Sequence, residues 1–151
     1  MMTFHSIVVP FDSSAPSKKA LNKAIDFCKE NPACRLYVIS VVVPDTRVFP
    51  AADPIVFNAE EYQSLQRQSV EKHKEALESQ VRPLVADLPN DIEIDVLSGE
   101  SPAESIDLFA EGHDSDLIVM GSRGLGSIRG AFGSVSKGVL HRTAIPVLIV
   151  K

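Results

Sequence analysis

Three observations predict an α/β fold for this chain of 151 residues, with a parallel sheet covered by helices on both faces. First, strand-type apolar runs alternate with amphipathic helical segments in the order βαβαβαβαβ. Second, the run 36–43 is apolar at nearly every position, which is typical of a parallel strand buried on both faces. Third, the length suits a single domain over residues 1–151. Such alternation implies right-handed crossovers between parallel strands.

The first strand and helix are predicted from a change of pattern near the N-terminus. The apolar run 6–11 is followed by Asp12-Ser-Ser-Ala-Pro16, in which capping side chains precede a proline, as at the start of a helix. Apolar residues then recur at helical spacing as far as Cys28, with lysines on the other side. We therefore expect a helix to about residue 31, followed by the strand 36–43.

The middle of the chain is expected to contain an irregular connection and one long helix. Residues 44–58 contain three prolines and little periodicity, and their aromatic residues are Phe49 and Phe57. From residue 59 to about 88, apolar residues recur at helical spacing, and Pro83 falls in the last turn. The charged residues of this segment are expected to form a solvated helix face.

The last third of the chain repeats the pattern of strands and helices. Alternation over 92–97 marks an edge strand, and Ser101-Pro-Ala-Glu104 is a capping box that opens a helix. The apolar runs 116–120 and 145–150 are the last two strands. A helix starting near Gly133 is expected between them.

A glycine-rich segment directly follows the fourth strand and is the main candidate for function. Six of the eight glycines lie between Gly121 and Gly138. Residues 117–151 carry five basic side chains and no Asp or Glu, although the net charge of the chain is −5. Because glycine permits a close approach to the backbone, this pattern indicates a phosphate cradle. The alternative is a surface loop whose glycines only serve turns.

Two further features border the same crevice if the first and fourth strands are neighbours. The helix start Gly133-Ser134-Val135 supplies free backbone N–H groups at the positive end of the helix dipole, which suit a phosphate. Asp12 ends the first strand, and its carboxylate either accepts hydrogen bonds from a ribose or a base amino group or only caps the first helix. Arg123 would add positive charge. Neither Walker A nor Rossmann glycine spacing is present.

Composition and spacing argue against several other classes of function. The acidic pI of about 5.3 argues against a nucleic-acid partner. No apolar run is long enough to span a membrane, and the N-terminus lacks the regions of a signal peptide, so we expect a cytoplasmic protein without a membrane partner. Cys28 and Cys34 lack CxxC spacing and are expected to be reduced packing residues. The four histidines form no metal-binding motif.

The motifs of this chain resemble those of the universal stress protein family. The pattern Gly-x-x-Gly, a spacer and then Gly-Ser lies between a strand ending in Met-Gly and a final strand Pro-Val-Leu-Ile-Val. The likeness covers nearly the whole chain and rests on the segments 7–13, 40–41, 99–102, 116–124, 133–135 and 145–150. The resemblance implies a Rossmann-like, five-stranded parallel sheet of order 3-2-1-4-5, usually dimeric through the last strand. It also implies that ATP binds at the switch point of the sheet.

The resemblance further implies which residues contact each part of the nucleotide. Those beside adenosine would be Asp12 and Val41, with Pro10, Phe11 and Met120 lining the pocket. Those at the ribose and phosphates would be Gly121, Gly124, Gly133, Ser134 and the amide of Val135, with Arg123 nearby. One departure is that eight residues, 125–132, separate the second and third motif glycines, where the family usually has nine. We expect the loop to accommodate the shorter spacer. The property that the shorter spacer would affect is the geometry of phosphate binding.

The leading hypothesis is an ATP-binding regulatory protein of the stress response, dimeric through Val147–Val150, that acts on an unidentified protein partner. ATP, AMP or another adenine nucleotide would bind with Mg²⁺ or Mn²⁺ held through its phosphates. No catalytic residue is expected and hydrolysis would at most be slow, because no carboxylate pair, nucleophile–base couple or metal cage is evident. One alternative is a nucleotide-free interaction module of the same fold. Another is an enzyme that cleaves ATP between the α and β phosphates, although its usual glycine loop is absent after strand one.

Overall fold

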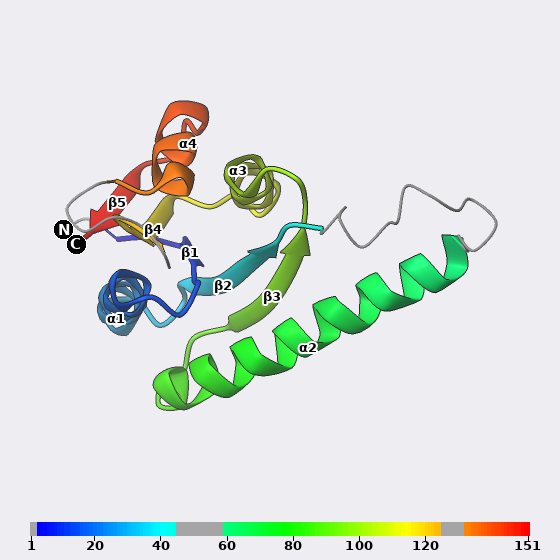
Figure 1. Ribbon diagram of the computed structural model, residues 1–151. Helices are drawn as coiled ribbons and strands as arrows, with labels where there is room; N and C mark the ends of the chain where they lie inside the picture. The colour runs from blue at the N-terminus through cyan, green and yellow to red at the C-terminus, as the bar shows by residue number, and fades with distance from the viewer. Residues whose placement is uncertain (1–2, 45–58, 125–131) are drawn as a thin grey trace.

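The computed structural model describes residues 3–44, 59–124 and 132–151, in which five strands alternate with four helices as expected (Figure 1). The expectations for Phe49, Phe57 and most of the glycine-loop spacer lie outside these residues. The strands are β1 Ser6–Pro10, β2 Arg35–Val42, β3 Ile92–Ser98, β4 Leu117–Gly121 and β5 Val147–Val150. The helices are α1 Ala15–Glu30, α2 Ala59–Val85, α3 Pro102–Gly112 and α4 Ser134–Arg142.

The sheet is parallel throughout, and its strand order is β3-β2-β1-β4-β5, which confirms the order that the family resemblance implied. The central strand β1 pairs with β2 on one side and with β4 on the other, so that Val8 is in register with both Tyr37 and Ile118. The chain therefore reverses its direction of travel across the sheet between β1 and β4. Ligands of open α/β sheets bind outside the carboxyl ends of the strands at such a reversal.

Two helices cover each face of the sheet (Figure 1). Along β1, Ile7 and Val9 pack with apolar residues of α1 and α2, whereas Val8 packs with those of α3 and α4. All three side chains are fully buried. Strand β1 is thus a central strand buried on both faces, and burying such side chains contributes roughly 1.5–3 kcal/mol each.

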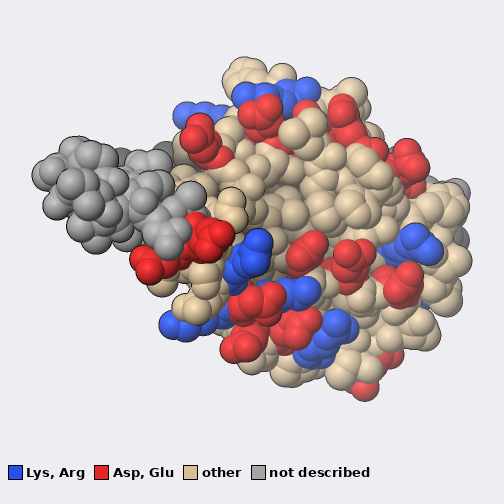
Figure 2. All heavy atoms as spheres, turned by 90° about the vertical axis from the view of Figure 1, so that its right-hand side faces the viewer, with Lys and Arg blue, Asp and Glu red and all other residues tan. Residues whose placement is uncertain are grey.

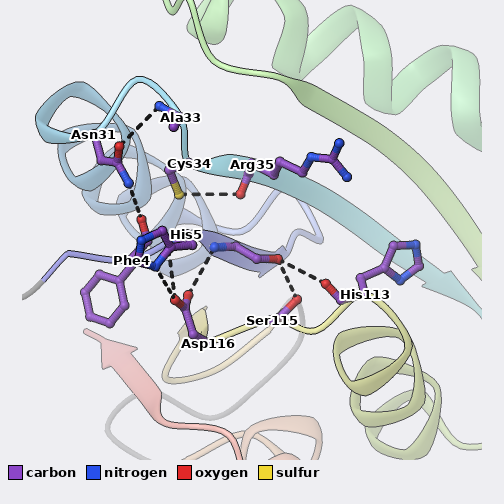
Figure 3. A network of polar contacts seen from close by, with 10 residues as sticks. Phe4, His5, Asn31, Ala33, Cys34, Arg35, His113, Ser115 and Asp116 are labelled. Atoms are coloured by element: carbon purple, nitrogen blue, oxygen red, sulfur yellow. Dashed lines mark hydrogen bonds and ion pairs between the residues drawn. The ribbon is translucent and has the colours of Figure 1, made fainter.

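The amino ends of the strands are closed by polar side chains that bind backbone groups. The Asp116 carboxylate accepts hydrogen bonds from the N–H groups of His5 (2.9 Å) and Ser6 (3.1 Å), and so joins β4 to the start of β1. Figure 3 shows this contact beside Asn31, whose amide donates to the carbonyl of Phe4. These bonds satisfy backbone groups that the parallel ladder leaves unpaired at its ends.

Within the part of the chain that is described, no helix is both long and apolar enough to cross a membrane. The longest helix, α2, carries charged residues along much of its length and buries Leu77 and Val81 in its second half. Its first half projects beyond the sheet (Figure 1).

Candidate functional site

A cavity of about 240 Å³ lies at the carboxyl ends of β1 and β4, at the switch point of the sheet. Nine of the residues proposed from the sequence line it: Pro10, Asp12, Met120, Gly121, Arg123, Gly124, Gly133, Ser134 and Val135. The sequence therefore located the place where the β1–α1 turn, the end of β4 and the start of α4 meet.

The β1–α1 turn brings the Asp12 carboxylate to this cavity. Ser14, and not Asp12, is the N-cap of α1, because the Ser14 hydroxyl accepts a hydrogen bond from the Ser17 N–H at 3.2 Å. Asp12 instead accepts a hydrogen bond from the N–H of Ser14 at 2.9 Å, which closes a tight Asx-type turn. Of the two roles weighed for Asp12, helix capping thus belongs to its neighbour, and the Asp12 side chain lines the cavity.

Two glycines allow this turn to pack against β4. A Cβ atom on Gly121 would lie 2.8 Å from the Pro16 Cβ and 2.9 Å from the Ser17 nitrogen, so only glycine lets the first turn of α1 approach β4 this closely. A Cβ on Gly124 would collide with the Asp12 carboxylate. Close approach of the backbone, and not a left-handed φ angle, is what these two positions require.

The glycine loop is closed at its base by hydrogen bonds between its two ends. The Gly133 N–H donates to the Ser122 carbonyl (2.8 Å), and the Ser136 hydroxyl donates to the Gly121 carbonyl (2.9 Å). These bonds fix the start of α4 beside the end of β4. Gly133 is the N-cap of α4 and has no side chain to cap the first turn, so the helix N-terminus faces the cavity without a side-chain cap.

Two proposed residues lie outside the cavity lining, and one lining residue, Ser17, was missed. Phe11 is buried in the core on the α1 side of the sheet, and Val41 packs against the core on the α3 side. Their contact with a ligand stays a prediction. Ser17 and Ser136 also line the cavity, and both are nearly fully buried. The sequence signal was weak, because a serine in the first turn of a helix usually needs no explanation beyond capping.

The cysteines are packing residues remote from the cavity, as the sequence predicted. Both are reduced and fully buried in the core. Burial raises the pKa of the Cys28 thiol to about 12, and it also raises the pKa of Cys34. Thiols held neutral in this way are poor nucleophiles and poor metal ligands. The residues that the structure describes include no group of three or more His, Cys, Asp or Glu placed to bind a metal ion.

Charges are mixed on the face that contains the projecting end of α2. Figure 2 shows acidic and basic side chains interspersed there, without a continuous basic patch on the visible surface. This face is therefore unlike the basic stripe that binds nucleic acid. It agrees with the solvated helix face expected from the sequence.

Comparison with known proteins gives concordant matches. A family model described as the universal stress protein family matches residues 3–151. The stress response protein NhaX of Bacillus subtilis is 34% identical to this chain, and the match covers 98% of this chain and 99% of NhaX. Among solved structures, the universal stress protein UspA from Lactobacillus plantarum matches with a TM-score of 0.78 at 24% identity, with both chains fully covered.

A second solved structure, a universal stress protein from Archaeoglobus fulgidus in complex with dAMP, matches with a TM-score of 0.67 at 24% identity. That match covers 99% of this chain and 100% of the other. The structural matches show a shared fold, and the family model and NhaX extend the likeness to the sequence of almost the whole chain. This chain belongs to the universal stress protein family.

Proposed function

We propose that this protein is a cytoplasmic, adenine-nucleotide-binding regulatory protein of the stress response, with ATP as its principal ligand. The observation that carries the proposal is the position of the Asp12 carboxylate and the N-terminus of α4 on the lining of one cavity at the switch point of the sheet. A carboxylate accepts hydrogen bonds from ribose hydroxyls or a base amino group, and a helix N-terminus binds phosphate. A nucleotide combines both groups in one molecule.

The chemistry of the lining supports one orientation of the ligand. Phosphates would lie at the N–H groups of Ser134 and Val135, with Arg123 supplying positive charge. The ribose and base would then extend toward Asp12 and Met120, and on to Val41 at the carboxyl end of β2. The dAMP bound to the Archaeoglobus fulgidus protein of the same fold supports an adenine nucleotide as the ligand class.

The residues present suit a metal ion held by the nucleotide and do not form a metal site of their own. Asp12 is the carboxylate that lines the cavity, so Mg²⁺ or Mn²⁺ would be coordinated mainly by phosphate oxygens and water. Ser136 donates its hydroxyl to the Gly121 carbonyl, which occupies it in positioning α4. This set of groups supports binding with at most slow hydrolysis.

Calorimetric titration of nucleotide-stripped protein tests the proposal. ATP with Mg²⁺ is expected to bind with micromolar or tighter affinity. Parallel titrations with AMP and cyclic AMP show how much the phosphates of ATP contribute to that affinity. Chromatography of the ligand released on denaturation identifies any nucleotide that co-purifies. The absence of both binding heat at several temperatures and co-purified nucleotide would contradict the proposal and favour a nucleotide-free interaction module.

A homodimer that pairs through β5 is part of the proposal. Strand β5 lies at the edge of the sheet beside β4, and its residues Val147 to Val150 are all apolar and half-buried. An apolar edge strand is a template for pairing with another strand. Light scattering should give twice the chain mass of 16.4 kDa at micromolar concentration. A monomer at that concentration would contradict this part of the proposal.

A further inference from the structure

The turn that carries Asp12 is held in an unfavourable backbone conformation at Ser13. Ser13 has φ +69°, in the left-handed region that residues with a Cβ rarely adopt. Such a conformation is energetically unfavourable and persists where the surroundings determine it. Contacts with the surrounding structure therefore hold this turn in place next to the cavity.

Part of the restraint comes from within the turn. The Asp12 carboxylate accepts a hydrogen bond from the Ser14 N–H, and the Ser14 hydroxyl accepts one from the Ser17 N–H. These bonds connect neighbouring residues, so they shape the turn without fixing its position relative to the rest of the sheet.

A second restraint ties the turn to a different element. The Ser13 hydroxyl donates a hydrogen bond of 2.6 Å to the side-chain oxygen of Gln80, which lies 67 residues further along the chain on α2. Gln80 is next to Val81, which is fully buried, and three residues after Leu77, which is 5% exposed. The acceptor is thus carried by the part of α2 that packs on the core, although Gln80 itself is exposed.

Gly124 restrains the Asp12 carboxylate from the loop side. The carboxylate lies where a Cβ on Gly124 would stand, so the carboxylate packs directly against the loop backbone. The Asp12 side chain is therefore positioned between the loop that follows β4 and its own turn, and that turn is tied in addition to α2. A shift of the turn would move the carboxylate relative to Gly124 and to the cavity.

We infer that Ser13 and Gln80 are positioning residues that hold the Asp12 carboxylate in place for the nucleoside part of the ligand. This inference rests on the proposed function, because it assigns the contact to the same nucleotide site. The phosphates bind at the start of α4, which is held by separate bonds to β4. Loss of the Ser13–Gln80 bond should therefore weaken recognition of the nucleoside and leave phosphate binding unchanged.

The test compares ATP with inorganic tripolyphosphate, which lacks the ribose and base. ATP is titrated into the wild-type protein and into three variants: Gln80→Ala, Ser13→Ala and the double variant. The affinity of each protein for tripolyphosphate is measured by competition with a fluorescent ATP analogue. Gln68→Ala is the matched control, since Gln68 is an exposed glutamine on the same helix. Each single variant is expected to bind ATP roughly three- to tenfold more weakly, as for one lost hydrogen bond.

The double variant should be no weaker than either single variant, because both remove the same bond. Tripolyphosphate affinity should stay at the wild-type level in all variants, a result that general destabilisation of the site would not give. Unchanged ATP affinity in Gln80→Ala, additive losses, or equal losses for both ligands would overturn the inference. Failure of the wild-type protein to bind ATP would overturn the proposed function itself.

Discussion

The two ends of the parallel sheet are built from different residue types. At the amino ends of the strands, Asp116 binds the N–H groups of His5 and Ser6, and Asn90 donates to the carbonyls of three other residues. At the carboxyl ends, glycines line a cavity of about 240 Å³, and α4 begins without a side-chain cap. One end satisfies its backbone groups internally, and the other leaves them facing a cavity.

This difference explains how one fold separates stability from ligand binding. Asp and Asn carry acceptors and donors that satisfy nearby backbone groups, so the backbone groups that Asp116 and Asn90 bind are satisfied within the protein. Glycine has no side chain to do this, and it lets neighbouring backbone come close. The first-turn N–H groups of α4 therefore remain for a phosphate, at the edge of the sheet where parallel α/β folds bind their ligands.

Asn90→Ala is expected to have the largest effect on stability. Asn90 is 93% buried, and its amide donates to the carbonyls of Cys28 (3.2 Å), Asn31 (2.9 Å) and Cys34 (2.9 Å). Its removal leaves three carbonyls without this donor, which should lower the free energy of unfolding by about 2–4 kcal/mol. Urea unfolding measures the change. A loss below about 1 kcal/mol would mean that the amino end is not the stabilising end.

Gly124→Val should act at the opposite end, on binding more than on stability. The added side chain would displace the Asp12 carboxylate, so nucleotide affinity should fall at least about thirtyfold, or about 2 kcal/mol. Calorimetry with ATP measures this. Gly112→Val is the matched control, because a Cβ at Gly112 meets no atom within 4 Å. Wild-type affinity in a folded Gly124→Val protein would show that the loop is not the site.

The cysteines test whether the amino end is closed to solvent. Cys28 and Cys34 are fully buried, so iodoacetamide at pH 9.0, the ordinary thiol pKa, should not label the native protein but should label both residues in urea. Mass spectrometry counts the adducts.

Because folding raises the pKa of Cys28, its contribution to stability is complete below pH 9.0 and is lost as the pH rises toward about 12, by about 1.4 kcal/mol per pH unit. Rapid labelling of the native protein would contradict a closed end.

The sequence predicted the elements, and it indicated the part of the fold where the cavity lies, because both depend on local patterns. Alternating apolar runs and helical periodicity determine the strands and helices, and the glycine cluster after β4 marks the cavity. The ends of the elements differ by up to a few residues, as at α2, which ends at Val85 and not near residue 88.

The role of single polar residues was not predictable from these patterns. Asp12, Ser13 and Ser14 are all residue types that cap helices, and only the folded turn assigns the cap to Ser14. Ser17 reaches the cavity because Gly121 lets α1 approach β4, which is a tertiary contact. The bond from Ser13 to Gln80 joins residues 67 positions apart in sequence, and no local pattern pairs them.

The smallest effect is expected at Asp91, the neighbour of Asn90 at the same end of the sheet. Asp91 lies 3.5 Å from Arg35, but the two side chains are 75% and 63% exposed. Water screens such a pair, so Asp91→Asn should change the free energy of unfolding by less than about 0.5 kcal/mol. When this variant and Asn90→Ala are measured in the same urea series, the comparison shows whether burial of the side chain or its position at the amino end determines the loss of stability. A loss as large as that of Asn90→Ala would show that position at the amino end, and not buried hydrogen bonding, determines the contribution to stability.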